Sequence, residues 1–103
     1  MLLEGRFLYG SGGTNLKVWI QTRITGGTWR DIANFAFLLA AVTKFSSVSS
    51  YAALAAAVAT SDAALADDTI LNGFYGNDIR VKYTSTGTYA GATNVAVDVA
   101  FRS

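Results

Sequence analysis

The stretch VKYTSTGTYAGATNVAVDVAF, residues 81–101, decides the fold, because two apolar-alternating runs flank a polar, glycine-containing link. The second run repeats an apolar side chain at every other residue, as Val95, Val97, Val99 and Phe101. A period of two is typical of a strand with one face in a core. The stretch therefore predicts a β-hairpin that serves as scaffold, with its link at residues 84–91 free to make contacts.

A second alternating run, LKVWIQTRI at residues 16–24, predicts another half-buried strand. Its apolar face holds Leu16, Val18, Ile20 and Thr22, and its polar face holds Lys17, Trp19, Gln21 and Arg23. The turn TGG at residues 25–27 leads into TWRDIANFAFLLA, which predicts a β-hairpin. In that second arm we expect core positions at Trp29, Ile32, Phe35 and Phe37.

Further strands are predicted at residues 2–9, 42–50 and 78–86, the last with Ile79, Val81 and Tyr83 on its apolar face. The alanine-rich segment 51–66 stays open between a short helix and extended chain, because alanine favours helix but the segment is poorly capped. Many short strands with turn signals predict an all-β fold, an antiparallel β-sandwich of jelly-roll type. The 103 residues suffice for a single domain, 1–103.

The composition of the chain excludes several classes of protein and partner. Hydrophobic residues make up 51% of the chain and charged residues 15%, which excludes a disordered chain and suggests that partners cover part of the surface. The net charge of +1 and the scattered basic residues predict no specific nucleic-acid partner. The start MLLEGRFLYGSGG is not a signal peptide, and the apolar run 35–42 is too short for a bilayer, so we expect no membrane association.

Catalytic chemistry finds little support in the sequence. There is no histidine and no cysteine, which removes thiol chemistry and any Ser-His or Cys-His dyad. The acidic residues fall in predicted strands and turns without a facing pair, so we expect no enzyme, no catalytic residue and no cofactor. We expect no metal site either; the alternative is a calcium ion held by loop oxygens of Asp67, Asp68, Asn72 and Asp78.

Five residues are candidates for a protein interface. Trp19 lies on the polar face of its predicted strand with Lys17 and Arg23 beside it, and Tyr75 and Tyr89 lie in or next to loops. Aromatic side chains anchor many protein interfaces, but they also stack sugars. A glycan platform and a purely structural role therefore remain alternatives for the aromatic members.

The order of these motifs resembles a group of small β-sandwich proteins encoded by tailed bacteriophages and prophages. That group has a GSGGT turn, a VWVQTS-type strand, a GGATWxDIAxFxF hairpin and a later GDRLRVK…TTGTYAGGT segment. The corresponding residues here are Gly10 to Thr14, Val18 to Thr22, Gly26 to Phe37, Gly76 to Lys82 and Thr86 to Thr93. The alanine-rich middle, residues 39–66, departs from the pattern.

The resemblance implies a structural protein of the virion, assembled in the cytoplasm of the bacterial host. The leading hypothesis is a capsid decoration or cement protein that docks on the major capsid protein in many copies, itself a homo-oligomer or multi-copy component. The alternatives are a tail or fibre module that binds a host glycan, and a neck or connector protein.

Overall fold

The computed structural model describes residues 1–49, 57–71, 73 and 76–101, and every regular element among them is a strand. The strands in chain order are β1 (Leu2–Leu8), β2 (Ser11–Gly12), β3 (Asn15–Arg23), β4 (Arg30–Phe37), β5 (Val42–Ser47), β6 (Asp78–Thr86), β7 (Tyr89–Ala90) and β8 (Asn94–Ala100). None of the described residues lies in a helix long and apolar enough to cross a bilayer. The predicted all-β, antiparallel β-sandwich is confirmed.

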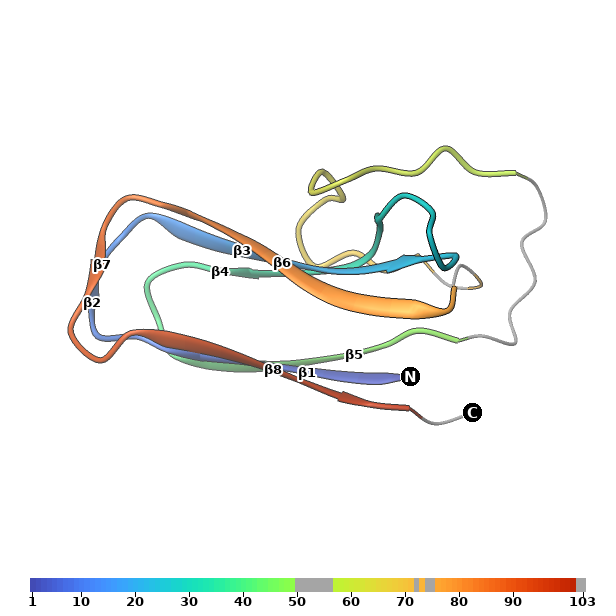
Figure 1. Cartoon of the computed structure of the whole chain (residues 1–103). Coiled ribbons are helices and arrows are strands. Elements are labelled where there is room, and N and C mark those ends of the chain that lie inside the picture. The colour runs from blue at the N-terminus through green and yellow to red at the C-terminus, as the bar shows by residue number, and fades with distance from the viewer. Residues whose placement is uncertain (50–56, 72, 74–75, 102–103) are drawn as a thin grey trace.

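Two three-stranded sheets form the layers of the sandwich, with orders β5-β1-β8 and β4-β3-β6 (Figure 1). The chain β1–β2–β3 runs antiparallel to β8–β7–β6 along its whole length. The short β2–β7 pair lies where this double ribbon bends from one sheet into the other. The chain therefore pairs its first strand with its last, as a folded ribbon does.

Glycine makes the bend possible. Gly12 has a φ of 73°, and a Cβ atom there would lie 2.3 Å from the backbone oxygen of Thr88 on the opposing segment. Side chains are excluded at that distance, so the two segments can approach only because residue 12 has no side chain. The GSGG stretch thus works as a close corner between two strands.

The core lies between the sheets and is built from the inward rows of β1, β3 and β4. Its buried apolar residues are Met1, Leu3, Phe7, Leu16, Val18, Ile20, Ile32, Ala33, Phe35, Phe37 and Val48. Phe7 stacks on Phe37 with ring centroids 5.1 Å apart, which joins the two sheets across the core. The predicted core positions Ile32, Phe35 and Phe37 are confirmed.

Trp29 is different, because it is only half-buried and is not part of the core cluster. Two guanidinium groups lie over its ring, with Arg23 at 4.4 Å and Arg80 at 4.6 Å from the ring centroid. The predicted core role for Trp29 is therefore wrong. The sequence shows an aromatic residue near a turn, but not the cations that the neighbouring strands bring to its faces.

The predicted β-hairpin at residues 81–101 is wrong. Residues 81–101 do not form a hairpin, because β6 and β8 belong to different sheets and their link holds β7, which pairs with β2. The alternation itself is real: Val81 and Tyr83 point to the core side of β6, opposite Ile20 and Val18 of β3. Both are nevertheless exposed, at 44% and 64%, because β6 is the edge of its sheet.

The predicted strands at 2–9, 42–50 and 78–86 appear as β1, β5 and β6 with similar bounds. The open segment 51–66 lies partly outside the described residues. Its described part, residues 57–66, contains neither helix nor strand. The backbone there is instead occupied by contacts to the outer face of β3 and β4.

Candidate functional site

The residues 57–71, here called the strap, cover the outer face of the β4-β3-β6 sheet (Figure 1). Backbone hydrogen bonds tie the strap to β4: Asp31 N to Ser61 O at 2.8 Å, and Asn34 N to Thr69 O at 2.9 Å. Leu71 N in turn donates to Ile32 O at 2.9 Å. The strap therefore also closes the free edge of β4, which would otherwise offer unpaired backbone groups.

Asp31 is the centre of this attachment. Its carboxylate is fully buried and accepts hydrogen bonds from Gln21 Nε2 at 2.8 Å and Ser61 Oγ at 2.9 Å. It also accepts bonds from the backbone N–H groups of residues 63–65, at 2.8 to 3.0 Å. Burial alone raises the pKa of the Asp31 carboxyl, but these hydrogen bonds, from Gln21 first, outweigh burial and lower that pKa below its ordinary value of 3.8. Asp31 is thus a charged structural anchor.

The strap also decides where the predicted interface residues lie. Trp19 is only 5% exposed, and its indole Nε1 donates to the backbone oxygen of Leu65 at 3.1 Å. Lys17 forms an ion pair with Asp67 of the strap at 3.1 Å. A distant part of the same chain therefore covers Trp19, and its predicted interface role stays a prediction. Lys17 is engaged by the same strap.

Arg23 is held at the end of β3. Its Nε lies 2.9 Å from Asp78 Oδ2, and its guanidinium group stacks on Trp29. Arg80, whose guanidinium group also lies over the Trp29 ring, donates from its Nε to Gln21 Oε1 at 2.8 Å. The interface prediction for Arg23 is untested, but these contacts give it an intramolecular role. Tyr75 lies outside the described residues.

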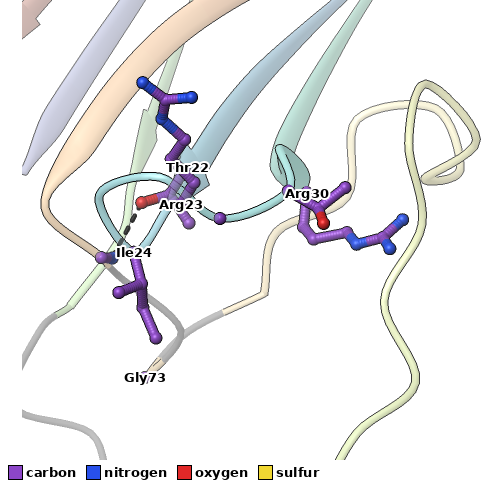
Figure 2. Close-up of a pocket in the computed structure, with 8 residues that line it drawn as sticks. Thr22, Arg23, Ile24, Arg30 and Gly73 are labelled. Carbon is purple, nitrogen blue, oxygen red and sulfur yellow. Dashed lines mark hydrogen bonds between the residues drawn. The ribbon is translucent and has the colours of Figure 1, made fainter.

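A pocket of about 420 Å³ lies beside this cluster, between the β3–β4 turn and the segment that precedes β6 (Figure 2). Its described lining holds no carboxylate, and consists of Thr22, Arg23, Ile24, Gly27, Thr28, Arg30, Gly73 and Gly76. Figure 2 shows Arg23 and Arg30 extending away from each other, so their guanidinium groups do not converge on one anion. Thr22 Oγ1 is also occupied, since it accepts a hydrogen bond from Gly76 N at 2.8 Å.

The acidic residues of the proposed calcium alternative lie in separate ion pairs. Asp67 pairs with Lys17, Asp68 with Lys44 at 2.9 Å, and Asp78 with Arg23. Asn72 lies outside the described residues. Among the residues that the structure describes, no group of three or more potential metal-ligating side chains gathers at one place.

The opposite end of the sandwich, at the β2–β7 bend, presents apolar side chains to solvent. Leu8 is 56% exposed, Leu38 is 64% exposed and Leu39 is 53% exposed. Leu8 ends β1, and the two other leucines belong to the link from β4 to β5. We call these three leucines the corner patch.

Tyr89 connects the corner patch to the core. Its hydroxyl donates to the backbone oxygen of Leu38 at 3.0 Å, and its ring meets Phe7 edge-on with centroids 5.7 Å apart. Burial raises the pKa of the Tyr89 phenol, and nearby Tyr9 adds to that increase. Tyr89 is thus a predicted interface residue that lies beside exposed apolar surface. Sequence reasoning missed the three leucines, because apolar residues next to a strand end are usually assigned to the core.

Comparisons of this chain with protein-family models, with curated proteins and with solved structures find no match.

Proposed function

We propose that the protein is a non-enzymatic structural component of a tailed-phage virion, a capsid decoration or cement protein that docks through the corner patch. The observation that carries the docking surface is the exposure of Leu8, Leu38 and Leu39, each more than half open to solvent at one end of a rigid sandwich. Isolated apolar side chains are common on protein surfaces, but several at one end of a domain favour a contact site.

The virion setting is supported by the resemblance of the turn and strand motifs, from Gly10 to Thr14 through Thr86 to Thr93, to small phage-encoded β-sandwich proteins. Two of those motifs build the bend that carries the corner patch: residues 10–14 include β2, and residues 86–93 include β7. We therefore assign the docking role to the end of the sandwich where these two motifs lie near the exposed leucines.

Docking would consist of binding alone, without a chemical reaction. A preformed corner would bury its leucines against the capsid shell, and many weak contacts around a symmetric shell would add up through avidity. The surface charge agrees with such a contact, because most described cations of this chain already have an acidic partner within the chain. A glycan platform at Trp19 is not favoured, since the strap covers that ring.

The test uses virions assembled from the gene cluster that encodes this chain. The double variant Leu38→Lys/Leu39→Lys should be lost from purified virions, whereas the matched control Ile24→Lys should be retained. Ile24 is 75% exposed at the opposite end of the sandwich, so the control places a lysine at an apolar site that is at least as open. Retention of the double variant at wild-type copy number would refute docking through the corner patch.

Cryo-electron microscopy of the wild-type virions then locates the protein. Density for this chain repeated over the icosahedral shell is the expected result for a decoration protein. Density confined to the portal vertex or the tail would replace that role with a connector or fibre role. Absence of the chain from every particle would overturn the virion assignment.

A further inference from the structure

The four long edges of the two sheets are unequal. The strap covers the outer edge of β4, and Lys44 of β5 reaches across to β4, where its Nζ donates to Ala36 O at 2.6 Å. An inward-pointing lysine on a short strand is a recognised way of blocking an edge. The β4–β5 side of the sandwich is therefore closed by the chain itself.

The other long side, made by β6 and β8, has no such closure. β6 is the edge of one sheet and β8 is the edge of the other. Among the described residues, no backbone hydrogen bond joins their outer edges to a further segment. We call this side, with Ile79, Val81 and Tyr83 of β6 and the row Val95, Val97 and Val99 of β8, the open side.

The open side carries apolar surface. Val81 and Tyr83 are exposed although they point to the core side of their sheet, and the three valines of β8 are only partly buried. A depression of about 170 Å³ indents this side, and its lining includes Tyr83, Tyr89 and Val95. Exposed edge strands with apolar inner rows are surfaces that pair with other strands.

We propose that the open side binds the open side of a second copy of this chain, in a two-fold symmetric dimer with its axis parallel to the strands. Rotation about that axis exchanges the two layers, so the partner's β8 comes to lie beside β6 and the partner's β6 beside β8. β6 and β8 run in opposite directions in each copy (Figure 1), so both new strand pairs are antiparallel. Each three-stranded sheet then continues into a three-stranded sheet of the partner.

One register of these strands matches every residue of β8 with a residue of β6. Placing Val81 opposite Val97 of the second copy also places Ile79 opposite Val99 and Tyr83 opposite Val95. These three inner pairs form a continuous apolar seam between the layers. Directly opposed apolar side chains of this kind are the unit that stabilises antiparallel sheets.

The outer row of the same register carries complementary charge. Arg80 lies opposite Asp98 of the second copy, and the adjacent Lys82 lies opposite Ala96. The Asp98 side chain is 64% exposed and pairs with Arg6 at 3.2 Å in its own chain, so an additional cation can reach it. The other two-fold arrangement, with β6 beside the partner's β6, sets Arg80 and Lys82 of one copy against those of the other. Like charges directly opposite each other disfavour that arrangement.

The first test measures the mass of the purified protein by light scattering over a concentration series. We expect a concentration-dependent dimer, and Val81→Lys should raise its dissociation constant by about 100-fold or more, because the symmetric seam would bury the new charge twice. The matched control is Val42→Lys on β5, since Val42 is 39% exposed and Val81 is 44% exposed. A monomer at every concentration of the wild-type chain would overturn the proposal, and so would equal effects of the two variants.

A second test fixes the arrangement and does not depend on how Val81→Lys folds. The chain contains no cysteine, so single cysteines report only the designed contact. Val81→Cys and Val97→Cys chains, co-expressed and oxidised, should form a disulfide-linked dimer, whereas neither variant alone should do so. A linked dimer from Val81→Cys alone would indicate that β6 meets β6 and would overturn the proposed axis. Because both tests use the isolated protein, their outcome is separate from docking at the corner patch.

Discussion

The side-chain amide of Gln21 lies 2.8 Å from the carboxylate of Asp31, and both residues are fully buried. That pair marks the place where the strap is attached to the sandwich. The carboxylate accepts further hydrogen bonds from Ser61 and the backbone of residues 63–65. A single buried charge thus organises a long segment that has no regular structure of its own.

Replacement of Asp31 by Asn should lower the free energy of unfolding by about 3 kcal/mol at neutral pH, because an amide cannot accept all of these bonds and its N–H groups would face other donors. Urea denaturation measures the change. Asp67→Asn is the control; its side chain is 55% exposed and makes a surface ion pair, so we expect less than about 1 kcal/mol. Equal losses in the two variants would contradict the anchoring role.

The same carboxylate predicts a pH dependence. The pKa of Asp31 is lower in the folded protein than its ordinary value of 3.8. The stability that it contributes is therefore complete above 3.8 and is lost as the pH falls through the folded-state pKa. The difference in unfolding free energy between wild type and Asp31→Asn should shrink as the pH is lowered through this range. A difference that stays constant at acidic pH would mean that Asp31 does not bind as a carboxylate.

Trp19→Ala should destabilise the isolated protein by about 3–5 kcal/mol, because it removes a buried ring and leaves a cavity beneath the strap. The loss should appear in urea denaturation without any partner present. Trp19→Phe tests the polar contact, and we expect a smaller loss of about 1–2 kcal/mol from the missing bond to Leu65 O. If Trp19→Ala is as stable as the wild type, the Trp19 ring does not stabilise the fold, and a role as a surface anchor is favoured.

Alanine substitutions at Gly12 and Gly26 allow the effect of backbone strain to be measured separately from that of a steric clash. Gly12 and Gly26 both have positive φ, at 73° and 81°, so alanine is strained at either position. A Cβ at residue 26 meets nothing within 4 Å, whereas a Cβ at residue 12 would lie 2.3 Å from Thr88 O. We expect about 1 kcal/mol of destabilisation for Gly26→Ala and at least about 3 kcal/mol for Gly12→Ala, measured by thermal unfolding. Similar values would show that the bend can open.

Lys44→Met should lower the free energy of unfolding by about 1–2 kcal/mol, because the Nζ atom joins β5 to Ala36 O of β4 and to Asp68 of the strap. Its control is Lys17→Met, which removes one partly exposed ion pair and should change the unfolding free energy by about 0.5 kcal/mol or less. Hydrogen exchange of the β4 and β5 amides would locate the effect. Unchanged exchange at β5 would argue against Lys44 as the closure of that side.

The sequence predicted the strands well, because alternation at residues 16–24 and 78–86 is a local signal. It predicted that β3 is half-buried, but both faces are covered at its centre, since burial of Trp19 and Gln21 depends on a strap that lies far along the chain. It also could not show that β6 is an edge, because an apolar row looks the same at an edge and in the centre of a sheet. Only the pairing reveals that Val81 and Tyr83 remain open.

The pairing of β1 with β8 and of β3 with β6 has a consequence for synthesis of the chain. Both sheets obtain their last strand from residues 78–100, so neither layer can be completed before this segment has been synthesised. The long sequence separation of these contacts also favours slow folding, during which the apolar rows of β1 and β3 would depend on chaperones for protection.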